Sequence, residues 1–202
     1  MSVLNSVVKF VKYSTKPAVC YMAKHVSVTR PDAIDFAAKL INSGLVIAVP
    51  TDTLYGLACD ATNLEAIVKL YGVKQRSEYK PVAICLAKIS DISLWANIKH
   101  LPEGLLDELF PGPVTVILTS LEKLDQSVCR KNKIGIRIPN HSFITDLVSK
   151  VQKPLALTSA NLSNQPSTVS PLQFKNIWDK IAGIFDGGIT KKVLPMKPAL
   201  IF

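Results

Sequence analysis

Residues 31–57 read PDAIDFAAKLINSGLVIAVPTDTLYGL, and this stretch decides the fold class. Its first part places apolar residues at helical spacing from Ala33 to Ile41, and Gly44 follows as a stop signal. The run 45–49 then has the composition of a buried strand, and a proline ends it. The stretch therefore predicts a helix that leads into an apolar strand.

The same alternation of helices and short apolar strands continues along the rest of the chain. Further helices are expected at 63–72, 91–98, 102–110 and 141–150 and from Ser170 onward, and further strands at 81–86, 114–118, 134–138, 155–158 and 183–185. Such alternation favours an α/β sheet with helices packed against it. Ligands of these sheets bind where strand ends meet loops, so the loops after strands are the places to look for chemistry.

Length and composition narrow the class of protein. With 202 residues, 48% of them hydrophobic and 19% charged, the chain has the size and apolar content of one globular domain. No stretch approaches the roughly 18 to 20 apolar residues of a membrane helix, so no transmembrane segment is expected. The four cysteines include no C-x-x-C pair, which favours reduced thiols over a zinc site or a disulfide framework.

The net charge of +9 is uneven along the chain. Residues 1–31 hold five basic residues and no acidic one, so more than half of the excess lies in a sixth of the chain. We therefore expect a basic N-terminal tail at 1–30 and a domain at 31–202. Two interpretations of the tail stay open, a mitochondrial targeting segment and an untargeted tail.

The segment 74–80, KQRSEYK, concentrates three cations in seven residues. In an extended chain the spacing of Lys74 and Arg76 points both side chains to one side, where they suit a polyphosphate. Arg offers a planar fork to phosphate oxygens and Lys a mobile charge. A solvated surface loop is the competing interpretation.

Two polar turns directly follow predicted strands. The segment 158–163, TSANLS, offers hydroxyl and amide groups, and the segment 50–57, PTDTLYGL, offers two hydroxyls and a carboxylate. Groups placed at strand ends can meet a ligand instead of competing with a helix for backbone hydrogen bonds. Ordinary turns without a ligand explain both segments equally well.

Several standard catalytic patterns are missing. The sequence contains no P-loop, no G-x-S-x-G, no H-E-x-x-H and no G-x-G-x-x-G motif. We expect His25, His100 and His141 to be surface or helix-capping residues. Histidine-based acid–base catalysis and metal binding by side chains therefore have little support.

Taken together, these segments resemble the threonylcarbamoyl-AMP synthase family of Sua5, YrdC and YciO proteins, and most of all its short eukaryotic members with a YrdC domain. Residues 50–57 are similar to the family's P-T-[DE]-T-x-Y-G-L motif. Its K-x-R…S-x-N signature is matched by Lys74, Arg76, Ser159 and Asn161, and its further motifs follow in order at 80–81, 111–115, 135–139 and 159–163 with Ser167. The resemblance runs from about residue 31 to residue 188.

The resemblance implies a single-domain α/β fold of the YrdC/RibB-like kind, with an open, twisted, mixed sheet and flanking helices around a positively charged cleft. It also implies a nucleotidyltransferase that makes threonylcarbamoyl-AMP and pyrophosphate from L-threonine, bicarbonate and ATP. That product serves the t6A modification of position 37 in tRNA. Such a reaction mainly needs alignment of the reactants and neutralisation of negative charge.

Site roles follow from the same resemblance, residue by residue. It implies Lys74, Arg76, Ser159 and Asn161 as catalytic residues, these four with Lys80 and Ser167 as the ATP site, and Thr53 and Arg137 as the L-threonine site. Mg²⁺ would come with ATP as the cofactor. Further implied partners are tRNA or double-stranded RNA and a downstream threonylcarbamoyl transferase complex.

The sequence departs from the family pattern at two places. Cys85 stands where many bacterial relatives have histidine, so one side of the L-threonine pocket is expected to be lined differently. After 186–188 the family usually continues into a S-T-[VI]-[VI]-D strand, whereas residues 189–202 follow another pattern and contain no serine or acidic residue. We expect the apolar end 199–202 to cover the sheet edge left beside that strand.

A second class of function stays open beside the enzyme, namely a catalytically impaired protein of this fold that binds RNA or a nucleotide, or regulates. The charge of only +4 outside residues 1–31 and the 7% aromatic content argue against RNA as the main ligand. We therefore favour the enzyme. The expected compartment is the cytoplasm, with the mitochondrion as the alternative.

Overall fold

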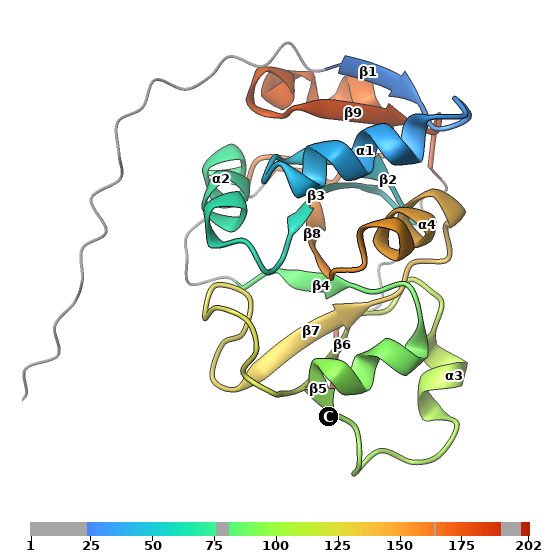
Figure 1. Cartoon of the computed structure of the whole chain (residues 1–202), viewed down its shortest axis with the longest axis vertical. Coiled ribbons are helices and arrows are strands. Elements are labelled where there is room, and N and C mark those ends of the chain that lie inside the picture. Colours follow the sequence, from blue (N-terminus) through green and yellow to red (C-terminus); the bar gives the residue numbers. More distant parts are fainter. Residues whose placement is uncertain (1–23, 76–80, 164, 191–198) are drawn as a thin grey trace, which may run out of the picture.

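The computed structural model describes residues 24–75, 81–163, 165–190 and 199–202 (Figure 1). Its strands are β1 (Lys24–Ser27), β2 (Ile47–Pro50), β3 (Tyr55–Asp60), β4 (Ala83–Cys85), β5 (Ala96–Asn97), β6 (Val116–Ser120), β7 (Lys133–Arg137), β8 (Leu155–Ser159), β9 (Gly183–Asp186) and β10 (Leu200–Ile201). Its α-helices are α1 (Ala33–Asn42), α2 (Leu64–Lys74), α3 (Leu105–Leu109) and α4 (Ser142–Val151), and its 3₁₀ helices are η1 (Ile89–Leu94) and η2 (Pro171–Lys180).

All of these strands join one sheet in the order β1-β9-β2-β3-β8-β4-β7-β6-β10, with β5 paired to β6 beside that path. Strand β3 runs antiparallel to both β2 and β8, whereas β9 runs parallel to β1 and β2. Since β1 and β10 end the order without pairing to each other, the sheet stays open. The predicted α/β fold with an open mixed sheet and flanking helices is confirmed.

Two apolar layers cover the two faces of the sheet. Ala37 and Ile41 of α1 pack with Ile144 and Leu147 of α4 in one buried cluster, and Figure 1 shows both helices over the same face. A second cluster contains the buried side of α2 and Phe174 of η2. This layering leaves the polar loops at the strand ends to form the site.

Strand β3 lies in the middle of the sheet, although its first residues were expected to belong to a turn. All six of its residues are buried. Gly56 lies so close to β8 that a Cβ atom there would stand 2.6 Å from Leu157 Cδ1. The sequence of β3 is short, contains a glycine and does not alternate, so its period does not identify a strand. Residues 51–54 therefore form the hairpin turn between β2 and β3.

Helix α2 begins as expected and ends later than expected. The N–H of Ala66 donates to the side chain of Asn63 at 3.1 Å, which confirms the predicted N-cap. Gly72 does not end the helix, which continues to Lys74 and closes at Gln75 with a left-handed φ of 48°. Lys74 therefore stands on the last turn of a helix instead of in the loop that follows.

At the N-terminal end of the described chain, a strand precedes the expected start of the domain. Residues 24–27 form β1, paired in register with β9 and with Val26 buried, so the domain begins before residue 31. At the other end β10 pairs with β6 and extends that edge of the sheet. The segments expected as helices at 91–98 and after Ser170 are η1 with β5, and η2.

Candidate active site

The turn between β2 and β3 is folded by one threonine. The Thr51 hydroxyl donates to the carbonyl of Leu54 at 2.7 Å and accepts the N–H groups of Thr53 and Leu54, both at 3.2 Å. Both Thr51 and Thr53 are buried. The turn therefore holds Asp52 and Thr53 in a defined place against the end of β7.

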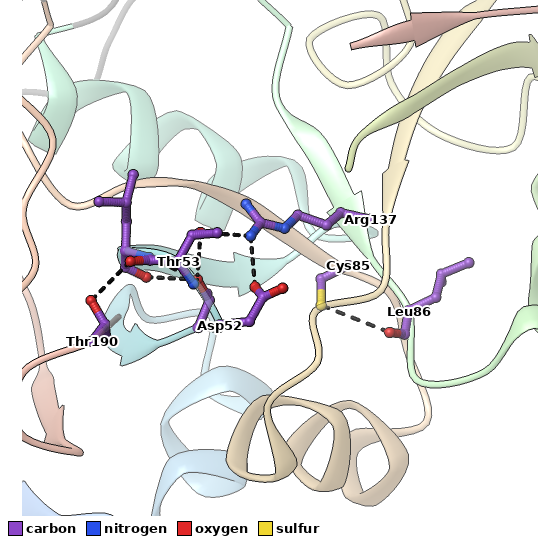
Figure 2. A network of polar contacts seen from close by, with 8 residues as sticks. Asp52, Thr53, Cys85, Leu86, Arg137 and Thr190 are labelled. Atoms are coloured by element: carbon purple, nitrogen blue, oxygen red, sulfur yellow. Dashed lines mark hydrogen bonds and ion pairs between the residues drawn. The ribbon is translucent and has the colours of Figure 1, made fainter. Parts of the chain in front are cut away.

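Arg137, the last residue of β7, reaches across to this turn (Figure 2). Its Nη2 donates to Asp52 Oδ1 and to Thr53 Oγ1, both at 2.7 Å. The side chains of Arg137 and Asp52 are only 14% and 10% exposed, so the pair is largely removed from water. We call Asp52, Thr53 and Arg137 the arginine cluster. It unites the two residues that the resemblance assigns to L-threonine.

The arginine cluster retains unused hydrogen-bonding capacity. Within the described part of the chain, Asp52 Oδ2, Arg137 Nε and His141 Nδ1 are buried atoms without a hydrogen-bond partner. Buried polar groups are usually paired, so such atoms mark a place where a ligand or an ordered water completes the structure. Of these three residues, His141 lines a pocket of about 340 Å³, together with Pro111 and Ile138 among others.

His141 corrects the expectation of a simple surface or capping residue. It occupies the N-cap position of α4, but its side chain makes no capping hydrogen bond. Burial lowers the pKa of His141, and the negative charge of Asp52 opposes that shift. Its position shortly after the 135–139 motif, which contains Arg137, was the sequence signal that could have placed it near the arginine cluster.

Cys85 lies directly beside Arg137, because β4 and β7 pair in register at these two residues. Its thiol is fully buried and contacts the carbonyl of Leu86 at 3.8 Å (Figure 2). Burial raises the pKa of Cys85 to about 12, so the group stays a neutral thiol near pH 7. Cys85 therefore supports the arginine cluster as a small apolar residue.

A second group of polar residues surrounds Lys74. Its ammonium group donates to the carbonyls of Ser159 and Asn161, both at 2.7 Å, to Asn161 Oδ1 at 2.9 Å and to Ser159 Oγ at 3.3 Å. Lys74 is 3% exposed, and its three protons all have acceptors. We call Lys74, Ser159 and Asn161 the lysine cluster. The K-x-R…S-x-N pattern had predicted that these residues meet.

The amide of Asn161 strengthens the lysine cluster. Its oxygen also accepts the Ser159 hydroxyl, and its nitrogen donates to the carbonyl of Gln165. Ser167, a further predicted ATP contact, is exposed and precedes the buried Thr168, whose hydroxyl donates to the carbonyl of Ala160 at 2.9 Å. The predicted phosphate contacts Arg76 and Lys80 lie outside the described residues, so the positive charge of the cleft stays a prediction.

Tyr55 joins the two clusters. It follows the turn that carries Thr53, and its carbonyl accepts the N–H of Ala160 at 2.8 Å in the middle of the lysine cluster's loop. Its N–H donates to the carbonyl of Thr168 at 2.9 Å. The residue thereby fixes both clusters to one strand of the sheet.

The segment 186–190 closes the site from another side. The Tyr55 hydroxyl donates to the carbonyl of Gly188 at 2.7 Å and accepts the N–H of Gly187 at 3.0 Å. Thr190, which no sequence pattern singled out, donates its hydroxyl to the carbonyl of Thr53 at 3.0 Å (Figure 2). A hydroxyl group therefore stands against the arginine cluster although the segment holds no serine.

In the described ranges, no helix has the length and apolar character to cross a membrane. Nor do three histidine, cysteine, aspartate or glutamate side chains of these ranges gather in a way that suits a metal ion.

Known proteins are similar to this chain over most of its length. The threonylcarbamoyl-AMP synthases of Bos taurus and Homo sapiens are 45% and 43% identical over 158 residues, which cover 78% of this chain and 57% and 56% of those proteins. The putative threonylcarbamoyl-AMP synthase of Methanocaldococcus jannaschii is 36% identical over 168 residues, covering 82% of this chain and 79% of that protein. The chain thus spans little more than half the length of the mammalian relatives, and these names do not favour the RNA-binding or regulatory alternative.

Solved structures agree with these relatives. Pyrococcus abyssi Sua5 complexed with L-threonine superposes with a TM-score of 0.76 at 29% identity, over 83% of this chain and 51% of that one. E. coli YciO has the same fold, with a TM-score of 0.74 over 90% of this chain and 88% of its own, at 22% identity. A family model for Sua5, YciO and YrdC, described as "Telomere recombination", matches residues 39–195. The chain therefore belongs to the Sua5/YciO/YrdC family.

Proposed function

We propose that the protein is a threonylcarbamoyl-AMP synthase, which makes threonylcarbamoyl-AMP and pyrophosphate from L-threonine, bicarbonate and ATP. The observation that carries the proposal is the pair of clusters that Tyr55 holds in one site. The relatives of that name and the Sua5 structure with L-threonine support it. The lysine cluster would serve the nucleotide and the arginine cluster the amino acid.

The arginine cluster suits an amino acid because it keeps one free hydrogen-bond donor and one free acceptor. Arg137 Nε is a donor for a carboxylate oxygen, and Asp52 Oδ2 is an acceptor for an amino or hydroxyl group. Thr53 Oγ1 accepts a hydrogen bond from Arg137 Nη2 and still has hydrogen-bonding capacity. L-Threonine carries a carboxylate, an amine and a hydroxyl, and the small site would hold it by these groups.

The lysine cluster suits the phosphate chain of ATP through charge and fixed dipoles. Lys74 supplies a buried positive charge at the end of α2, and Ser159 and Asn161 supply polar groups that it holds in place. Arg76, Lys80 and Ser167 would add contacts to the phosphates. Preorganised charge of this kind stabilises a phosphorus centre that gains negative charge during transfer.

Mg²⁺ enters the proposal as part of the ATP substrate. Oxygen donors are the ligands that Mg²⁺ accepts, but Ser159 Oγ and Asn161 Oδ1 already bind Lys74. The residues therefore fit an ion that arrives on the phosphates and keeps water ligands. Bound there, the ion would neutralise phosphate oxygens.

The chemistry then needs no protein nucleophile. The amine of L-threonine takes up the carbon of bicarbonate with loss of water and forms a carbamate. A carbamate oxygen attacks the α-phosphorus of ATP. The bond between the α-phosphorus and the oxygen that bridges it to the β-phosphorus breaks, and pyrophosphate leaves. The two clusters contribute by aligning the carbamate with the α-phosphorus and by neutralising charge.

Downstream partners follow from the product. The adenylate would pass to a threonylcarbamoyl transferase complex that modifies position 37 of tRNA, and direct contact with tRNA or double-stranded RNA belongs to the same proposal. The expected compartment is the cytoplasm. Fusing residues 1–31 to a reporter tests the mitochondrion as the alternative.

The decisive experiment incubates the purified protein with ATP, bicarbonate and labelled L-threonine. We expect equal amounts of pyrophosphate and labelled adenylate, and no adenylate when L-threonine or bicarbonate is left out. Pyrophosphate that forms without L-threonine, or no product at all with folded protein, would contradict the proposal.

A further inference from the structure

Thr190 is the last residue of the segment 186–190 and makes two kinds of contact with the site. Its N–H donates to the carbonyl of Val169 at 2.9 Å. Its hydroxyl lies 3.0 Å from the carbonyl of Thr53 and 3.3 Å from that of Val169. The residue is 8% exposed, so these bonds form away from water.

The hydroxyl carries one proton, so the two carbonyls compete for it. Thr53 is the nearer acceptor, and the N–H of the same residue already serves Val169. The hydroxyl bond to Thr53 is therefore the contact that Thr190 adds beyond its backbone pairing. It joins the segment 186–190 to the turn that carries the arginine cluster.

Thr53 is consequently held from two directions. Arg137 binds its side-chain oxygen at 2.7 Å, and Thr190 binds its backbone carbonyl at 3.0 Å (Figure 2). The segment behind Thr190 is itself fixed, because the Tyr55 hydroxyl binds Gly187 and Gly188. The Thr190 bond therefore restrains the backbone of the residue whose side-chain oxygen binds Arg137.

We propose that Thr190 is a positioning residue of the L-threonine site, which it serves by fixing the Thr53 peptide and thereby the Thr53 hydroxyl beside Arg137. The inference rests on the proposed function, since it assigns L-threonine to Thr53 and Arg137. Thr190 touches no reacting atom. Its contribution is a preformed orientation of a substrate contact.

The test compares Thr190→Val with Thr190→Ser. Valine keeps the shape of threonine and removes the hydroxyl, whereas serine keeps the hydroxyl and removes the methyl group. The loss of one buried hydrogen bond should raise the KM for L-threonine in Thr190→Val about 2- to 12-fold. The KM for ATP should stay within about 2-fold, because the lysine cluster does not contact Thr190. Thr190→Ser should behave like the wild type.

Each outcome decides something. If the wild type makes no adenylate, the proposed function fails and the inference fails with it. If the wild type is active and Thr190→Val leaves the KM for L-threonine unchanged, only the inference fails. An equal rise of both KM values would indicate a general structural role, and a Thr190→Ser variant as impaired as Thr190→Val would assign the effect to methyl packing. Both results overturn the inference, and thermal melting of all three proteins verifies folding.

Discussion

The lysine cluster and the arginine cluster are both linked to β3 through Tyr55, and they differ in how their hydrogen bonds are used. Every proton of the Lys74 ammonium group has an oxygen acceptor within the protein. In and beside the arginine cluster, by contrast, Asp52 Oδ2, Arg137 Nε and His141 Nδ1 have no partner in the described ranges. One half of the site is complete without a ligand, and the other half offers free groups to one.

This contrast separates two ways of preparing a site. A satisfied buried cation fixes the loop around it, because removing the cation leaves several carbonyls without a donor. A partly unsatisfied ion pair instead keeps groups available for a substrate, at some cost in stability. Substitutions in the lysine cluster should therefore damage the nucleotide side and the fold together, whereas those in the arginine cluster should affect mainly L-threonine.

The largest effect is expected from Lys74→Met, which keeps the length of the side chain and removes its charge. The carbonyls of Ser159 and Asn161 would lose their donor, so the free energy of unfolding should fall by about 1.5 to 3 kcal/mol. Adenylate formation should fall about 10²- to 10³-fold through loss of preorganised charge. Denaturant unfolding and the labelled-threonine assay measure the two effects.

Lys69→Met is the matched control, because Lys69 stands on the same helix and donates to the carbonyl of Gly44 at 2.8 Å, away from both clusters. Its activity should stay within about 2-fold of the wild type. A Lys74→Met protein as active as this control would show that the lysine cluster only supports the fold.

Asp52→Asn should have the next largest effect and should act on the other half of the site. The amide oxygen can still accept from Arg137, but the charge that pairs with the guanidinium is lost. We expect the KM for L-threonine to rise about 10-fold, which corresponds to about 1.4 kcal/mol, while the KM for ATP changes little. Steady-state kinetics with each substrate varied in turn gives both values.

The control for Asp52→Asn is Asp35→Asn. Asp35 pairs with Lys150 at 2.6 Å, and the two side chains are 57% and 56% exposed, so this surface ion pair should contribute little. If Asp52→Asn raised both KM values together, the division of labour between the clusters would be wrong.

The parts of the site that were predicted from sequence are those that lie in compact motifs. The family resemblance paired Lys74 with Ser159 and Asn161, and Thr53 with Arg137, and the structure brings each set together. Their catalytic roles stay predictions. The motifs could be located because Lys74, Arg137 and Ser159 end elements whose apolar pattern is clear.

The missed parts depend on contacts between distant segments. Thr190 contacts the site through a hydrogen bond to the backbone carbonyl of Thr53, and His141 contributes a buried ring nitrogen. Neither feature leaves a periodic signal in the sequence. Strand β3 was missed because tertiary burial, and not alternation, makes it a strand. For the same reason β1 was assigned to the tail, since only its pairing with β9 gives Val26 a place in the core.

Removal of β1 should affect the arginine cluster more than the lysine cluster, because β1 pairs with β9. Deleting residues 1–30 takes away the strand that pairs with β9 and the buried Val26, whose burial contributes about 1.5 to 3 kcal/mol. Because β9 leads into the segment 186–190, the KM for L-threonine should rise a few-fold and the KM for ATP should not.

A shorter deletion of residues 1–22 removes no residue of β1 and is the matched control. The longer deletion should lower the melting temperature relative to the shorter one by several degrees. Identical melting curves and identical KM values for the two deletions would show that β1 neither stabilises the domain nor supports the arginine cluster.

The smallest effect concerns His141 and the pH dependence of stability. Burial lowers its folded-state pKa below the usual 6.5, against the weaker opposing effect of Asp52. The unfolded chain therefore binds more protons between the folded-state pKa and about 6.5, so this contribution to stability is fully present above that range and falls as the pH drops through it. The melting temperature of His141→Gln, which cannot be protonated at this position, should fall less between about pH 7.5 and about pH 5 than that of the wild type.

His100→Gln is the control, because His100 is exposed and distant in sequence from both clusters, and it should follow the wild-type curve. If His141→Gln also followed the wild-type curve, protonation of His141 would not be the cause of the lower stability at acidic pH.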